Sequence, residues 1–398
     1  MHVERFFHKR GQLDGRAGMS WIALRMLIGN RGKYFAIVFG IAFACMLMAQ
    51  QASIFVGLMR NTTSQIRDIS GADIWVMDPS VEFVDDITPL SDDDLYRVRG
   101  VSGVAWAVPL YKGLAQAQFR EGNFKQFIVL GLDDQTLVGA PPQMLLGSIG
   151  DLRSPDAVII DEYGFRYLWP NQPLRIGETF EMNDTRAHIV GICRASPTFQ
   201  TFPIVYTTYS QALRYSAQER RTLSFILAKA QSGVPVDEVC QRILQQTGRL
   251  ALSQRNFAWM TITYYLRRTG IPINFGTTVL LGFIIGASIA GQTFHLFTIS
   301  NLRHFAALKA MGLTNPRIIG MVLIQGFFVG LIGYGIGLGM TCGIEEILAL
   351  RLKTIPMAAD MVWQIPAGTA VAMALIVLVT SVFSLRRVLT LEPATAFR

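Results

Sequence analysis

The sequence predicts a membrane α-helical protein with four transmembrane helices and a large α+β extracytoplasmic domain inserted between the first and the second helix. Its apolar share of 51% is too high, and its charged share of 16% too low, for an ordinary soluble chain. A transmembrane helix needs roughly 20 largely apolar residues in a row. Four windows of sufficient length contain no Asp, Glu, Lys or Arg, namely 34–59, 271–302, 318–344 and 361–385. One long polar stretch, 57–270, separates the first window from the second and is large enough to bury its own core.

The net charge of +8 reflects membrane topology and not affinity for nucleic acid. The segments 1–33, 299–317 and 386–398 together carry 13 basic and 3 acidic residues, whereas 57–270 carries 21 basic and 22 acidic residues. Basic residues concentrate in the cytoplasmic loops of membrane proteins. We therefore expect a multi-pass membrane protein with both termini in the cytoplasm and the large domain outside, which the resemblance described below places in the bacterial inner membrane and the periplasm. Membrane lipid is an expected partner and nucleic acid is not.

The first 33 residues are predicted to form a cytoplasmic tail and a short helix at the membrane interface. Trp21 is the expected anchor of that helix, because tryptophan favours the headgroup region. The first transmembrane helix is then predicted over 34–56.

The segment 57–270 has the pattern of a periplasmic α+β domain. Ser91 followed by three aspartates predicts a helix that runs through Arg99, since serine caps helices and acids favour their first turn. Turn residues at 121–123 and 183–184 predict two hairpins. Further strands are expected at 72–77, 157–160, 203–208 and 223–229, and further helices from 161 to 168 and over 235–246. Cys193 and Cys240 lie in this domain, where a disulfide between them can form if they are close.

Three more transmembrane helices are predicted over 271–298, 318–344 and 366–385, with an external loop at 345–365 and a cytoplasmic tail at 386–398. Glycines four residues apart recur in them, and such pairs let helices approach closely in lipid. The pairs serve contacts within one chain or between two copies, and the sequence does not decide between these. They are Gly282/Gly286, Gly326/Gly330, Gly333/Gly337 and Gly335/Gly339.

The cytoplasmic loop 299–317 is predicted to contain a short amphipathic helix. Phe305, Leu308 and Met311 recur at helical spacing, and the loop carries three basic residues and no acid. Gly312 is expected to close the helix, because glycine readily adopts the left-handed conformation that ends many helices. A capped helix between two transmembrane helices provides a contact site through which a cytoplasmic partner can move them.

The sequence shows no pattern of a catalytic, cofactor or metal site. It lacks the G-x-x-x-x-G-K-[ST] loop that binds nucleotide phosphates, and it lacks H-E-x-x-H, G-x-S-x-G and C-x-x-C. The transmembrane windows hold no acid, lysine or arginine, and His295 is expected to be structural. We therefore expect a non-catalytic membrane subunit without cofactors.

The order of segments resembles the permeases of MacB/FtsX/LolC-type ABC systems. The stretch Arg303-His-Phe-Ala-Ala-Leu-Lys-Ala-Met-Gly312 is similar to the coupling-helix motif of that family, Arg-Glu-x-x-x-Leu-(Arg/Lys)-Ala-(Ile/Met)-Gly, except that His304 replaces the acid. The ending 387–398 resembles the family's Leu-x-Pro-Ala-x-Ala-(Leu/Phe)-Arg. Residues 72–76 and 308–312 look most like the DevC branch, whose ATPase is a separate chain.

The resemblance implies a homodimer of permeases on two ATPase subunits, which use the ATP. The ATPases are expected to grip the coupling helix and so move the periplasmic domains, by mechanotransmission. DevC-like members resemble parts of tripartite export pumps, with an HlyD-type periplasmic adaptor and an outer-membrane channel. The gripped residues would be Arg303, His304, Ala307, Leu308, Lys309, Ala310, Met311 and Gly312.

Two alternatives stay open beside the exporter. One is an FtsX-like signalling or scaffold protein that controls a periplasmic cell-wall hydrolase, and the other is a lipoprotein-releasing permease. The length of the 57–270 insertion favours the exporter over the signalling protein, because the external loops of FtsX-type proteins are usually much smaller.

Overall fold

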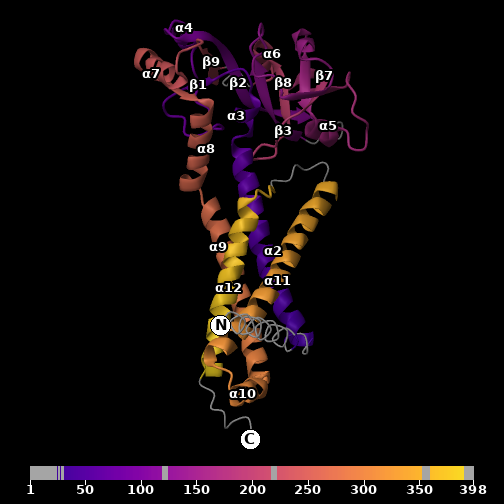
Figure 1. Ribbon diagram of the computed structural model, residues 1–398. Coiled ribbons are helices and arrows are strands. Elements are labelled where there is room, and N and C mark those ends of the chain that lie inside the picture. The colour runs from indigo at the N-terminus through magenta and orange to yellow at the C-terminus, as the bar shows by residue number, and fades with distance from the viewer. Residues whose placement is uncertain are drawn as a thin grey trace, which may run out of the picture. The chain divides into compact units, whose positions relative to one another are not determined.

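The computed structural model describes Arg25, Leu27 and residues 31–118, 124–216, 222–351 and 359–389 (Figure 1). The predicted interfacial helix at Trp21 and the family-like ending up to Arg398 lie outside the residues whose side chains are described. The chain divides into a helical unit and an α+β unit. The helical unit comprises the residues up to Val56, Pro272–Leu348 and those from Ala359, and the α+β unit consists mainly of Gly57–Ile271.

Four helices of the described chain are long and apolar enough to cross a membrane. They are α2 (Arg31–Thr62), α9 (Ile271–Ser300), α11 (Asn315–Arg351) and α12 (Gln364–Leu389). They confirm the predicted number of transmembrane helices and the place of the α+β insertion after the first. Each extends beyond its predicted span, because backbone hydrogen bonding continues into the polar residues that flank a charge-free window.

The four long helices share one buried cluster within the helical unit. Apolar burial brings no gain inside lipid, so close van der Waals contact has to hold such helices together. The contribution of α2 recurs at helical spacing, which places it on one face of that helix. The cluster includes Ile37, Ile41, Ala44 and Met48 of α2, Phe294 and Phe297 of α9, Val329 of α11, and Met373 and Ile376 of α12.

The α+β unit is built on a ten-stranded sheet in the order β10-β1-β9-β2-β3-β8-β5-β7-β4, and β6 pairs with β2 and β7. The strands are β1 (Ile74–Met77), β2 (Val104–Gln118), β3 (Phe124–Leu132), β4 (Gln143–Leu146), β5 (Ala157–Asp161), β6 (Thr179–Met182), β7 (Thr185–Arg194), β8 (Ile204–Thr208), β9 (Phe225–Ala230) and β10 (Leu250–Ser253). The helices are α3 (Ser64–Asp68), α4 (Asp92–Arg99), η1 (Ile149–Arg153), α5 (Glu162–Leu168), α6 (Tyr209–Arg214), α7 (Val236–Thr247) and α8 (Gln254–Arg268).

Both predicted strand pairs of the hairpins are present, as β2 with β3 and β6 with β7, and both are antiparallel. Asn183 and Asp184 connect β6 to β7 with φ angles of 44° and 61°. A two-residue hairpin loop of this kind needs positive φ at both residues, which Asn and Asp tolerate better than most. The predicted cap of α4 is present as well, because the Ser91 side chain accepts a hydrogen bond from the Asp94 N–H.

Strand β2 joins two parts of the sheet, because it changes neighbours in its middle. Up to Leu110 it pairs with β9, and from Tyr111 onward it pairs with β3. Where β2 changes neighbours, the Ser224 side chain replaces a neighbouring strand as the hydrogen-bond partner of the Lys112 backbone. Its Oγ accepts a hydrogen bond from the Lys112 N–H and donates one to the Lys112 C=O, both at 3.0 Å.

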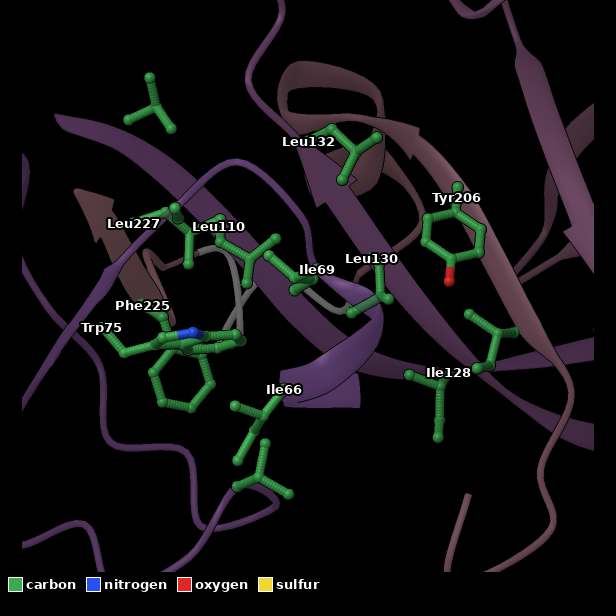
Figure 2. Packing of buried hydrophobic residues seen from close by; sticks show 14 of the residues in the cluster. Ile66, Ile69, Trp75, Leu110, Ile128, Leu130, Leu132, Tyr206, Phe225 and Leu227 are labelled. Atoms are coloured by element: carbon green, nitrogen blue, oxygen red, sulfur yellow. The ribbon is translucent and has the colours of Figure 1, made fainter. Parts of the chain in front are cut away.

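A large buried cluster surrounds Trp75 of β1. The ring of Trp75 lies edge-on to Phe225, with centroids 5.4 Å apart, and 5.3 Å from Phe257 of α8. Ile66 and Ile69 are 0% and 1% exposed and point into the same cluster (Figure 2). The chain that leaves the first transmembrane helix therefore enters the core of the α+β unit within a few residues.

Cys193 and Cys240 do not form a disulfide, which answers the question that the sequence leaves open. Both are unpaired and buried, and they lie in different clusters, Cys193 near Trp75 and Cys240 beside Ile243 of α7. Each packs as a small apolar side chain. Burial raises the pKa of the Cys240 thiol to about 11, so the thiol stays protonated and unreactive at neutral pH.

Candidate functional site

The candidate coupling helix is α10, Leu302–Ala310. It follows α9 after a single residue, Asn301, whose side-chain N–H donates to the Phe297 C=O at 2.9 Å. At the other end Gly312 has a φ of +93°. The Leu313 N–H bonds to the Leu308 C=O at 3.1 Å, and the Gly312 N–H bonds to the Lys309 C=O at 3.0 Å. These two bonds form the Schellman motif, so the glycine ends the helix as the sequence predicts.

One face of α10 is anchored to α11. Phe305 is 1% exposed and packs against Ile318 and Val322, and Ala306 beside it is buried. Phe305 therefore packs against residues of the helix that follows α10, and close-packed contacts of this kind resist a separate displacement of either helix. The contact joins α10 to a long apolar helix through buried side chains.

The opposite face of α10 is exposed. Arg303, His304, Ala307 and Ala310 are exposed, and Leu308 and Lys309 are half-buried. Met311 is 72% exposed, although it follows Phe305 and Leu308 at helical spacing in the sequence. The helix ends at Ala310, and Met311 caps it outside the helical repeat. The result is a surface of one arginine, one histidine, two small alanines and one methionine on which another protein can pack closely.

The segment that follows α2 is tied to the α+β unit by side-chain hydrogen bonds. The Asp68 carboxylate accepts from the Ser196 N–H at 2.7 Å and from the Ser196 hydroxyl at 2.8 Å. The Gln254 side-chain N–H donates to the Ile66 C=O at 2.6 Å and to the Ile69 C=O at 3.2 Å. These bonds fix the middle and the C-terminal end of α3 to the rest of the unit.

Gln254 also begins α8, the helix that leads to α9. Phe257, Thr261 and Tyr265 form the buried face of α8, and Phe257 contacts Trp75 and Phe225. One side chain thus links the segment arriving from the first transmembrane helix to the segment departing toward the second. The sequence reasoning missed α8. Ser253 as a cap, followed by apolar residues at spacings of four, is the signal that predicts it.

Six of the eight glycines in the pairs named above lie at helix contacts within the chain. A Cβ at Gly286 would lie 2.4 Å from Ala44 Cβ, and one at Gly337 would lie 2.5 Å from the Ala42 carbonyl oxygen. The corresponding distances are 3.3 Å to Met48 for Gly282, 2.7 Å to Ser381 for Gly326, 2.8 Å to Val377 for Gly330 and 2.7 Å to Ile41 for Gly333. Gly335 and Gly339 face open space, with no atom within 4 Å of such a Cβ.

The part of the chain that the structure describes holds no group of three or more His, Cys, Asp and Glu side chains placed to bind a metal. His295 lies on α9 with its ring centroid 6.5 Å from that of Phe383.

Two family models match the chain and together cover most of it. The model of the MacB-like periplasmic core domain matches residues 34–246, and the model of the FtsX-like permease C-terminal region matches residues 276–393. The first match alone spans more than half of the chain. The chain belongs to the MacB/FtsX type of ABC transporter permeases.

Relatives among known proteins carry the same description. An uncharacterised ABC transporter permease of Mycobacterium tuberculosis is 26% identical over 340 residues, which are 83% of this chain and 85% of that protein. An uncharacterised ABC transporter permease of Mycobacterium bovis is 26% identical over 321 residues, with coverages of 78% and 79%. Membership implies that this permease is a membrane subunit that works with an ATPase.

Two solved domains are similar to the α+β unit. The periplasmic region of MacB from Actinobacillus actinomycetemcomitans has a TM-score of 0.36 and 15% identity, and it covers 51% of this chain and 96% of that one. The extracellular domain of YknZ, a noncanonic ABC-type transporter from Gram-positive bacteria, has a TM-score of 0.34 and 12% identity, with coverages of 46% and 98%.

Proposed function

We propose that this permease transmits motion, driven by ATP hydrolysis on a separate ATPase chain, across the membrane to its α+β unit, and that it does so in an export system. The observation that carries the proposal is the construction of α10. The helix is rigidly capped at Gly312, anchored to α11 through Phe305 and exposed on the face that bears Arg303. A helix built in this way transfers a displacement caused by a bound ATPase to α11.

The contacts around Gln254 support the part of the proposal that concerns the α+β unit. The connections at the two ends of Gly57–Ile271, through α3 and through α8, meet at this side chain. A displacement of either transmembrane helix is therefore passed to the Trp75 cluster, because close-packed cores transmit strain. The windows 34–59, 271–302, 318–344 and 361–385 lack charged residues, which supports a mechanical role over a polar substrate path.

We further propose that the permease acts as a homodimer in the bacterial inner membrane, with both termini in the cytoplasm. The α+β unit then lies in the periplasm and engages an HlyD-type adaptor that leads to an outer-membrane channel. The length of the α+β unit supports this arrangement over FtsX-like signalling. The basic excess of the segments flanking the transmembrane helices supports the orientation.

Purification of the tagged permease from its native membranes in mild detergent tests this function. The wild-type chain is expected to bring down an ATP-binding subunit and a single-span periplasmic adaptor. Arg303→Glu reverses a charge on the exposed face of α10 and is expected to lower ATPase recovery about tenfold or more. Arg255→Glu, the same charge change on an exposed residue of α8, is the matched control and should leave recovery unchanged.

The identity of the co-purifying chains distinguishes the alternatives. An ATPase together with a cell-wall hydrolase, and without an adaptor, would establish the FtsX-like role in place of export. An ATPase together with a lipoprotein held by the α+β unit would indicate lipoprotein release. Equal ATPase recovery with Arg303→Glu, or no ATPase at all, would show that α10 is not the coupling helix.

A further inference from the structure

A cleft of about 420 Å³ opens in the α+β unit beside the point where β2 changes neighbours. Its volume lies in the range of about 300–1,000 Å³ that is typical of ligand sites. Residues of β2, of the loop after β1, of β3 and of the segment before β9 line it, together with Gln200. It is separate from α10 and from the Gln254 contacts, so the coupling function leaves it unexplained.

The floor of the cleft holds a buried lysine with an incomplete set of partners. The Lys112 side chain is 4% exposed, and its ammonium donates to the Val84 C=O at 2.8 Å and to the Asp85 carboxylate. An ammonium group has three N–H donors. Among the residues that the structure describes, no acceptor is present for the third. A buried donor of this kind calls for an acceptor oxygen from elsewhere.

The charge of Lys112 is already balanced, which restricts what the cleft can hold. Asp85 lies on the cleft wall with its side chain 30% exposed, and it forms an ion pair with Lys112. A free anion would be repelled by Asp85, and a cation by Lys112. The fitting acceptor is therefore a neutral oxygen, such as an amide carbonyl.

On the edge of β2 that borders the cleft, the backbone N–H and C=O of one residue have no hydrogen-bond partner among the described residues. Successive residues of a strand direct their N–H and C=O groups to opposite edges, so Lys112, Leu114 and Gln116 share an edge. Lys112 bonds to Ser224 on that edge, and Gln116 bonds to Asn183 through both backbone groups. Between them, no described residue bonds to the N–H or C=O of Leu114. The 39% exposed side chain of Leu114 lies beside this gap and also lines the cleft.

We propose that this cleft binds an extended segment of polypeptide from a protein outside the membrane. One residue of the segment pairs its backbone with the N–H and C=O of Leu114, and a neighbouring carbonyl accepts from Lys112. Its apolar side chains contact Ile87, Pro89 and Ile128 on the walls. Only a polypeptide backbone presents a donor and an acceptor at the spacing of a strand edge together with further neutral carbonyls, which is why we choose this occupant over a lipid or a sugar.

A photocrosslinking amino acid at Ile87, on the cleft wall, tests the proposal in the full-length chain in its native membranes. Irradiation is expected to give an adduct with a polypeptide, which mass spectrometry identifies as such. Leu114→Pro removes the open N–H but leaves the hydrogen bonds of Gly113 and Ala115 to β3 in place. It should lower the adduct yield about fivefold. Leu114→Val retains the N–H and should give the wild-type yield.

A second variant tests the proposal independently in case Leu114→Pro does not fold. Thr222→Trp fills the rim of the cleft from the segment before β9 without altering β2, and it should lower the yield to a similar extent. An adduct with a lipid or a small molecule, no adduct, or equal yields from Leu114→Pro and Leu114→Val would each overturn the proposal. Because the readout is the adduct alone, failure of the coupling function would leave this result unaffected.

Discussion

At the scale of single residues, Asp161 controls part of the pH dependence of stability. It is 6% exposed at the end of β5, and its Oδ1 accepts hydrogen bonds from the Gly164 N–H at 3.0 Å and the Ile204 N–H at 3.1 Å. Burial raises the pKa of Asp161 to about 7, although these two bonds oppose the rise. Asp161 is therefore protonated in the folded state, and ionised in the unfolded state, from about pH 4 to pH 7.

Because the folded state binds the extra proton over that range, Asp161 makes the protein less stable as the pH rises from about 4 to 7. Asp161→Asn keeps the acceptor oxygen and cannot ionise. The free energy of unfolding of the variant should rise relative to that of wild type as the pH rises. The gain is about 1.4 kcal/mol for each unit by which the pKa of Asp161 differs between the folded and the unfolded state. Denaturant unfolding of the purified full-length protein at pH 5 and pH 8, followed by tryptophan fluorescence, measures this gain.

Asp78 provides a control of opposite sign. Hydrogen bonds from Ser80 hold the pKa of Asp78 below its ordinary value, so its contribution to stability is present above about pH 4 and is lost as the pH falls. Asp78→Asn should therefore lose stability at pH 8 and lose less at low pH. A difference between Asp161→Asn and wild type that stays constant with pH would contradict the assignment for Asp161.

At the scale of helices, Gly337 and Gly339 of α11 differ in what surrounds them. A Cβ at Gly337 would lie 2.5 Å from a carbonyl oxygen of α2, which only a separation of the helices can relieve, whereas one at Gly339 meets nothing within 4 Å. Gly337→Ala should lower the stability of the helical unit by about 1–3 kcal/mol, because overpacking forces the backbone to shift. Gly339→Ala should be neutral or stabilising by up to about 1 kcal/mol, since alanine is the better helix former.

Thermal unfolding in detergent, compared between the two variants, measures this difference in stability. They carry the same chemical change two residues apart in one helix, so effects on helix propensity cancel. A lower stability only for Gly337→Ala would assign that glycine to a contact within the chain, a question that glycine spacing leaves open. Equal stabilities would contradict the contact between α2 and α11.

The elements that the sequence predicts are those whose cause is local. A charge-free window, a serine before three aspartates and a glycine at a left-handed position each act through neighbours in the chain, and α2, α4 and the end of α10 follow from them. The helix α8 has a local signal in its Ser253 cap, but the partners of its buried face, Trp75 and Phe225, are distant in sequence. Lys112 likewise gives no local signal, since Asp85 and Ser224 approach it only in the folded sheet.

At the scale of the whole molecule, the coupling function rests on few connections. In the proposed mechanism, motion that starts at α10 enters α11 through Phe305. The α+β unit receives it through α3 and α8, whose shared contact is the Gln254 side chain. Few connections make the function easy to break without loss of ATP hydrolysis, which takes place on the partner chain. Loss of response with retained hydrolysis is therefore the expected signature of a variant in this pathway.

Gln254→Glu keeps the size of the side chain and removes its N–H donors to Ile66 and Ile69. It should leave ATP hydrolysis by the assembled ATPase within about twofold of wild type, and it should reduce the movement of α8 that ATP induces by about fivefold, since two buried hydrogen bonds are lost. A fluorescent probe on Trp259→Cys, at an exposed position of α8, reports that movement once Cys342 is replaced by serine. Asn256→Ala, two residues further along α8, is the matched control and should preserve both signals. A wild-type probe response in Gln254→Glu would mean that motion enters the α+β unit by another route.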